Sequence, residues 1–189
     1  MKLISTLLLL LGSSVGQTQP FTFSPFAFSQ VSAYTWQAKN VASKEILAYV
    51  IEFEAPQVTI ASHDYYFKPE GIAPGAIESF DYVKASEPGH VLWVQYVDGT
   101  EWGDHKIGLS NILLHRQPML REITEMVSAY SHGEEKEFSA YLESNKEVDA
   151  FVKHIWILQQ QTATDGAVGH LKIRLDSAAK HDKMLEGKH

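Results

Sequence analysis

The sequence contains no cysteine among its 189 residues. A disulfide framework, a thiolate metal site and a cysteine nucleophile are therefore excluded. The same absence removes the residue that carries the lipid of a bacterial lipoprotein, so we expect no diacyl anchor. The fold must then depend on hydrophobic burial, for which a content of 44% hydrophobic residues is sufficient.

Clusters of basic residues and long apolar runs are also missing. The chain has 16 Lys and Arg against 23 Asp and Glu, a formal net charge of −7, and no block of five or six basic residues. Nucleic acid is not an expected partner, because phosphate binding needs clustered cations. Beyond the N-terminus, no apolar run approaches the roughly 20 residues of a membrane span, so we expect no span in the mature chain.

The N-terminus has the pattern of a secretory signal peptide over residues 1–16. Lys2 supplies a positive charge, an apolar stretch extends from Leu3 to Leu11, and Ser14 and Gly16 place small residues before a cut that precedes Gln17. We therefore expect a secreted or periplasmic protein.

The signal peptide is followed by two halves that differ in amino-acid composition and in hydrophobic pattern. Residues 17–106 are rich in aromatic, β-branched and proline residues, whereas residues 107–189 show helical periodicity. The sequence predicts an α+β protein, with an N-terminal antiparallel Ig-like β-sandwich followed by a C-terminal helical region packed on the sandwich. The connection at 103–108 is too short for freely tumbling domains, so we expect one cooperative unit.

Alternating apolar and polar residues between turn signals predict the strands. They are expected at 30–39, 45–54, 63–67, 76–83 and 90–97, with a return through 100–102. Asp98-Gly99 predicts a two-residue type I′ hairpin turn with both residues at positive φ.

Apolar stripes at helical spacing predict the helices. One is expected over about 110–131, where Pro118 kinks or opens it and Gly133 ends it. A short helix around Phe138 follows, then a helix after a capping box at Ser144 and Glu147, and a last helix after a loop at 162–166.

The turn after the first predicted strand carries a family resemblance. The segment Lys39-Asn40-Val41-Ala42-Ser43-Lys44-Glu45-Ile46, followed by a β-rich strand with acidic residues near its end, resembles the first hairpin of secreted bacterial Ig-like modules of the FxLYD and CARDB types. The resemblance extends over about residues 30–105 and implies a sandwich in which the Asn closes the turn. The chain has Phe53-Glu54-Ala55-Pro56 where the FxLYD pattern ends in Tyr-Asp-x-x-Gly. The resemblance implies no catalytic residue, because such modules mostly bind other molecules or act as spacers between other domains.

Residues with catalytic or metal-binding chemistry form no recognisable motif. The nine histidines include no pair three to five residues apart, so their spacing does not predict a zinc site, although separate loops could bring His63 and His105 together. The chain has neither a Gly-x-Ser-x-Gly elbow nor a phosphate-binding loop. We predict no catalytic residue, no metal ligand and no cofactor.

Aromatic residues are the better indication of function. Trp93, Tyr96 and Trp102 are the candidate binding residues, and their alternative role is to fill the sandwich core. Trp93 and Tyr96 are three residues apart in one strand, so their side chains point to opposite faces. We therefore expect one to face the core and the other to point outward or toward the helices.

These observations favour an exported, non-enzymatic binding or interaction module with an unknown protein or glycan partner. One alternative is an extracytoplasmic hydrolase or metal-dependent enzyme with its site between the two halves. A further alternative is an extracellular protease inhibitor, in which a stiff Pro-rich loop at 68–75 would enter the target.

Overall fold

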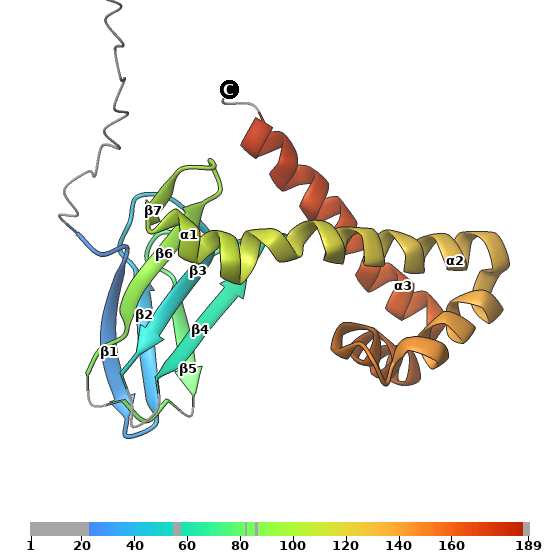
Figure 1. Ribbon diagram of the computed structural model, residues 1–189, viewed down its shortest axis with the longest axis horizontal. Helices are drawn as coiled ribbons and strands as arrows, with labels where there is room; N and C mark the ends of the chain where they lie inside the picture. Colours follow the sequence, from blue (N-terminus) through green and yellow to red (C-terminus); the bar gives the residue numbers. More distant parts are fainter. Residues whose placement is uncertain (1–22, 55–57, 82, 86, 187–189) are drawn as a thin grey trace, which may run out of the picture.

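A computed structural model describes residues 23–54, 58–81, 83–85 and 87–186 of the protein. The predicted signal peptide and Gln17 lie outside these residues. Figure 1 shows a part made of strands, from which a long helix extends and to which the last helix returns. The predicted α+β class is confirmed, because two antiparallel sheets precede the helices.

Seven strands make up the two sheets in the described part of the chain. They are β1 (Phe26–Ser32), β2 (Thr35–Asn40), β3 (Ile46–Phe53), β4 (Thr59–Asp64), β5 (Ile77–Asp81), β6 (His90–Tyr96) and β7 (Glu101–Gly103). One sheet has the order β1-β2-β5 and the other the order β4-β3-β6-β7, with antiparallel neighbours throughout. Aromatic rings join the inner faces, with centroids 5.5 Å apart for Phe26 and Tyr49 and 5.3 Å apart for Phe53 and Phe80. The two sheets therefore pack face to face.

Strand β3 is buried on both of its faces. One face lies in the core between the sheets and is formed by Leu47, Tyr49, Ile51 and Phe53. On the other face, Ala48 and Val50 form a second cluster with Trp93 and Ile112. A strand that is covered on both faces needs apolar residues at nearly every position. This explains why the segment from Ile46 to Ile51 contains no charged residue.

The segment 30–39, predicted as one strand, is instead part of a hairpin between β1 and β2. The turn contains Tyr34, whose backbone N–H donates to the Ser32 hydroxyl at 3.2 Å, a local bond that favours a turn over an extended strand. Trp36 and Ala38 are buried, whereas Tyr34 is 54% exposed.

The β6–β7 hairpin also differs from its prediction. The Gly99 N–H donates to the Tyr96 carbonyl at 2.9 Å, which places Val97 and Asp98 at the centre of the turn. Gly99 has a φ of 80°, whereas Asp98 is not at positive φ. This is a three-residue loop in which a turn is followed by a left-handed glycine, because Tyr96 also keeps a bond to the Thr100 carbonyl.

The helical part begins directly after β7. It consists of α1 (His105–Gly108), a π-helical turn η1 (Leu109–Leu113), α2 (Leu114–Asn145) and α3 (Ala150–Glu186). Pro118 lies inside α2, and the prediction that Gly133 ends the helix is wrong, since α2 continues through it. An interior glycine costs only about 1 kcal/mol, and the buried Phe138 and Leu142 in the following turns stabilise the continuous helix.

The predicted capping box after α2 is not formed. The Ser144 hydroxyl donates to the Ala140 carbonyl within α2, and Asp149 caps α3 by accepting from the backbone N–H groups of Phe151 and Val152 at 2.7 and 3.0 Å. Within the predicted loop at 162–166, only Ala163 (φ 60°, ψ 176°) is non-helical. At this break α3 changes direction, and its last part returns toward the sheets (Figure 1).

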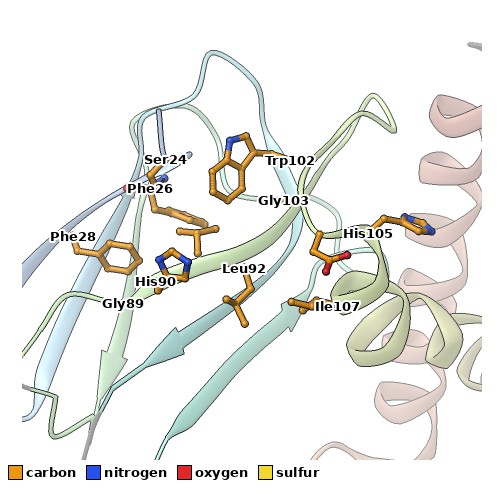
Figure 2. A pocket seen from close by; sticks show the side chains of 12 residues that line it. Ser24, Phe26, Phe28, Gly89, His90, Leu92, Trp102, Gly103, His105 and Ile107 are labelled. Carbon is orange, nitrogen blue, oxygen red and sulfur yellow. Dashed lines mark hydrogen bonds between the residues drawn. The ribbon is translucent and has the colours of Figure 1, made fainter. Parts of the chain in front are cut away.

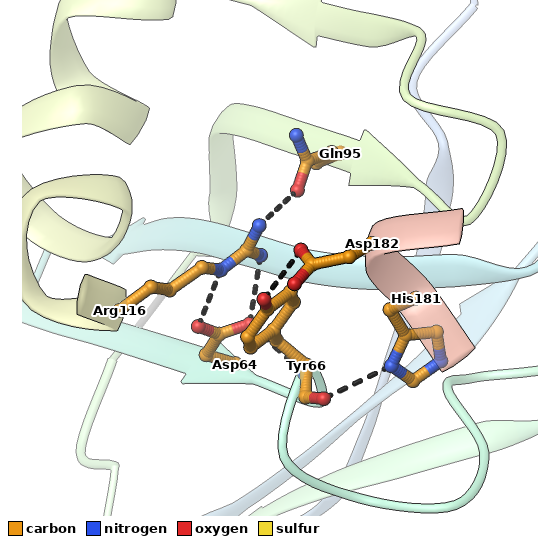
Figure 3. Close-up of polar contacts among 6 residues, drawn as sticks. All are labelled: Asp64, Tyr66, Gln95, Arg116, His181 and Asp182. Carbon is orange, nitrogen blue, oxygen red and sulfur yellow. Dashed lines mark hydrogen bonds and ion pairs between the residues drawn. The ribbon is translucent and has the colours of Figure 1, made fainter. Parts of the chain in front are cut away.

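Arg116 of α2 ties the helices to the sandwich (Figure 3). Its guanidinium donates to both carboxylate oxygens of Asp64 at 2.8 Å and to the side chain of Gln95 at 2.8 Å. It also lies 4.6 Å from the ring centroid of Tyr66. Arg116 is only 7% exposed, so its charge is compensated where water is largely excluded.

The end of α3 contacts the same region. Asp182 accepts from the Tyr66 hydroxyl, and the buried His181 bonds through Nδ1 to the Tyr66 carbonyl at 2.9 Å (Figure 3). Burial and this bond to Asp182 raise the pKa of the Tyr66 phenol, which therefore remains a donor. None of the helices in the described ranges combines the length and apolar composition needed to cross a membrane.

Candidate functional site

The three candidate aromatic residues do not form one surface. Trp93 is fully buried between the β4-β3-β6-β7 sheet and the helices, and its Nε1 donates to Glu101 at 2.9 Å, so a surface ligand has no access to its ring. Tyr96 is half-buried, with the Lys44 ammonium 5.5 Å from its ring centroid. Burial, reinforced by Asp98, raises the pKa of Tyr96. Trp102 lines an apolar cavity.

This apolar cavity has a volume of about 810 Å³ and opens between β1, β6, β7 and the start of α1. Figure 2 shows Trp102, Phe26 and Phe28 around it, with Leu92 and Ile107 below them in this view. The polar residues Ser24, His90, Asp104 and His105 also border it. Drug-sized ligands are bound in cavities of this size and composition.

The cavity exists because β7 is short. Strand β7 pairs only with Trp93, Val94 and Gln95, and after the Asp104 N–H donates to the Leu92 carbonyl the chain turns into α1. Gly103 permits this exit, since its φ is 93° and an added Cβ would lie 2.2 Å from the Leu92 carbonyl oxygen. Consequently, β7 does not pair with β6 at residues 90–92; the Leu92 carbonyl there bonds to Asp104, and no described strand covers this edge at His90 and Val91.

The polar residues at the cavity's edge are held by bonds of their own. Glu101 accepts from both Trp93 Nε1 and His105 Nδ1, the latter at 2.7 Å. Asp104 caps α1 by accepting from the Lys106 N–H at 2.9 Å. The imidazole of His105 points away from Trp102 in Figure 2. The cavity therefore offers an apolar interior rather than a set of converging acids and bases.

The histidines that the sequence singled out for enzyme chemistry do not come together. His63 and His105 belong to separate clusters, with Lys68 and with Glu101 respectively. The described residues include no group of three or more His, Asp or Glu that could hold a metal ion.

The loop at 68–75 is tied to the rest of the fold rather than protruding. Ile72 forms a β-bridge with Ile46, and Lys180 of α3 donates to the Pro69 carbonyl at 3.0 Å. A protruding loop was the feature that would have favoured protease inhibition.

Sequence reasoning missed Phe26 and Phe28 as cavity residues. They alternate along β1, and this period-two pattern within a Phe/Ser/Pro-rich stretch was the available signal. It also missed Arg116, for which a single sequence carries no signal, because its partner Asp64 lies 52 residues away.

Comparison of the chain with protein-family models, curated proteins and solved structures gives no match. The resemblance to Ig-like modules therefore stays a prediction.

Proposed function

We propose that the protein is an exported, non-enzymatic binding module that takes an apolar side chain of an extended polypeptide into the cavity beside Trp102. The observation that carries this proposal is the aromatic-lined hollow of about 810 Å³ next to a stretch of β6 that β7 leaves uncovered. An uncovered sheet edge recognises an extended peptide by main-chain hydrogen bonds, and adjacent pockets select its side chains. A glycan fits less well, because Trp102 lines a hollow and does not present a flat exposed ring.

The order of the strands supports an Ig-like arrangement for the sandwich. In Ig domains the first, second and fifth strands share one sheet and the third, sixth and seventh the other. Here β1, β2 and β5 form one sheet and β3, β6 and β7 belong to the other, with β4 beside β3, where variable-type domains add a strand. The short β7 is the departure that leaves the cavity open.

Export is supported by Lys2, the apolar stretch and the small residues before Gln17. N-terminal sequencing of the protein recovered from a secreting host should begin at or near Gln17. A product that retains Met1 and stays in the cytoplasm would contradict export. The described residues contain no group that could hold a metal ion, and the loop at 68–75 is tied to the fold, so neither the metal-dependent enzyme nor the inhibitor is favoured.

The binding proposal is tested with two capped, uncharged peptides. Acetyl-Thr-Phe-Thr-Phe-Thr-amide should bind saturably in calorimetric titrations, whereas the peptide with both Phe replaced by Ser should not. The Trp102→Ala variant should bind the first peptide at least tenfold more weakly. Trp156→Ala, which removes a tryptophan from α3 outside the cavity, is the matched control and should bind like the parent. Equal binding of both peptides, or no effect of Trp102→Ala, would overturn the proposal.

A further inference from the structure

A second cleft, of about 470 Å³, lies where the sandwich meets the helices. Its walls come from β4 and the turn that follows it, from η1 and the first turns of α2, and from the returning part of α3. It shares no lining residue with the apolar cavity beside Trp102. An inference about this cleft is therefore independent of the proposed function.

The charge of this cleft is opposite to that of the chain as a whole. Lys68, Arg116 and Arg174 line it, and Asp64 is the single carboxylate among its lining residues. Arg116 already binds both oxygens of Asp64 (Figure 3). The positive charges of Lys68 and Arg174 are thus left uncompensated within the cleft of a protein whose formal net charge is −7.

Lys68 is held in place by groups that do not neutralise it. Its Nζ lies 2.6 Å from His63 Nε2 and 4.6 Å from the ring centroid of Tyr65. Burial, with the Lys68 charge nearby, lowers the pKa of His63, so the imidazole is neutral and accepts from the ammonium. Behind His63, the Glu78 carboxylate accepts from the hydroxyls of Tyr49 and Tyr65.

Arg174 is half-buried and, like Lys68, has no carboxylate partner among the described residues. Its Nε donates to His170 Nε2 at 2.9 Å, and its guanidinium lies 5.2 Å from the ring centroid of Phe151. Burial lowers the pKa of this guanidinium. Across the described ranges, neither Lys68 nor Arg174 forms an ion pair with an acidic side chain. Arginine is seldom withdrawn from water without a counter-charge, so a ligand that brings one would relieve this cost.

Apolar side chains complete the lining. Phe67, Ile112 and Met119 come from the turn after β4, from η1 and from α2. We propose that this cleft binds an organic anion, whose carboxylate or phosphate group lies between Lys68 and Arg174 and whose apolar body lies against these three residues. The planar guanidinium suits both anionic groups, because its N–H donors match their oxygens in pairs.

Calorimetric titration with hexyl phosphate and hexanoate tests this proposal. Each should bind the intact protein saturably at one site, whereas hexylammonium should not bind. Arg174→Gln and Lys68→Gln should each weaken binding at least tenfold. Lys183→Gln removes the same charge from an exposed position on α3 outside the cleft and should change affinity less than twofold. Urea midpoints near that of the parent would show that the variants are folded.

Three outcomes would overturn the proposal. They are failure of the folded parent to bind either anion, binding of hexylammonium with similar affinity, and parent-like affinity in both Lys68→Gln and Arg174→Gln. Trp102→Ala should leave hexyl phosphate binding unchanged, which separates this site from the peptide site. If the peptide proposal failed while the anion bound as expected, this inference would stand.

Discussion

Gly108 lies so close to the indole of Trp93 that a Cβ added to it would be 2.1 Å from Trp93 Cε2. Trp93 is fully buried, and Glu101 bonds both to its Nε1 and to His105 in α1. This contact sets the position at which the helical part leaves the sandwich.

Gly108→Ala should therefore destabilise the protein by about 2 kcal/mol, because overpacking outweighs the helix propensity gained. Gly169→Ala is the matched control, since it also lies in a helix but its Cβ would meet nothing within 4 Å. That control should be neutral or stabilising by up to about 1 kcal/mol. Urea unfolding measures both values, and equal effects would contradict the close contact.

Gly99 should tolerate only residues that accept a left-handed backbone. Gly99→Val is expected to cost at least about 1 kcal/mol, because the φ of 80° is strained for a β-branched side chain. Gly99→Asn should cost clearly less, since Asn populates this region. Coinciding denaturant midpoints for the Val variant and the parent would show that the turn is assigned wrongly.

The Arg116–Asp64 pair should be strongly coupled. Arg116→Met is expected to destabilise by about 3 kcal/mol, because it leaves the Asp64 carboxylate without its counter-ion in a largely buried setting. Arg116→Met with Asp64→Leu should be less destabilised than the sum of the single variants by about 1 kcal/mol or more. The surface pair Lys146–Glu143, with Glu143 62% exposed, should couple by less than about 0.5 kcal/mol in the same cycle.

His63 should make stability fall on acidification. Its pKa is lowered in the folded state by burial and by Lys68, so below the unfolded value of about 6.5 the unfolded chain binds more protons. Stability from this group is therefore complete above that pH and is lost as the pH falls from there through the lower pKa of the folded state. The urea midpoint should decline less between pH 7.5 and 5.5 in His63→Gln than in the parent. An equal decline in the variant and the parent would contradict the lowered pKa of His63.

The sandwich should be unstable without the helices. A fragment of residues 17–106 would expose the face formed by Ala48, Val50 and Trp93, and each large side chain so exposed forfeits roughly 1.5–3 kcal/mol. We expect this fragment to aggregate on gel filtration and to melt well below the full chain. A monomeric fragment as heat-resistant as the whole protein would show two independent domains.

The α+β class and the approximate positions of β3, β5 and β6 followed from the sequence because periodicity is local, whereas the strand predicted at 63–67 lies at Thr59–Asp64. The alternation that buries Trp36 and Ala38, and the apolar residues of β3, are set within a few residues of chain. Local patterns were less reliable at the ends of strands and helices. At the turn containing Tyr34 and in α2 at Gly133, the alternative conformations differ little in free energy, so packing against neighbouring residues decides between them.

The candidate sites were decided only by the tertiary structure. The apolar cavity depends on where β7 stops against β6, and no residue of β7 alone encodes that the pairing ends at Trp93. Arg116 meets Asp64 across 52 residues, and His181 meets Tyr66 across 115. Such contacts arise when packing brings distant segments together. The entropic cost of closing a loop rises only slowly with its length, so many distant pairings cost about the same. A single sequence therefore does not specify which residues meet.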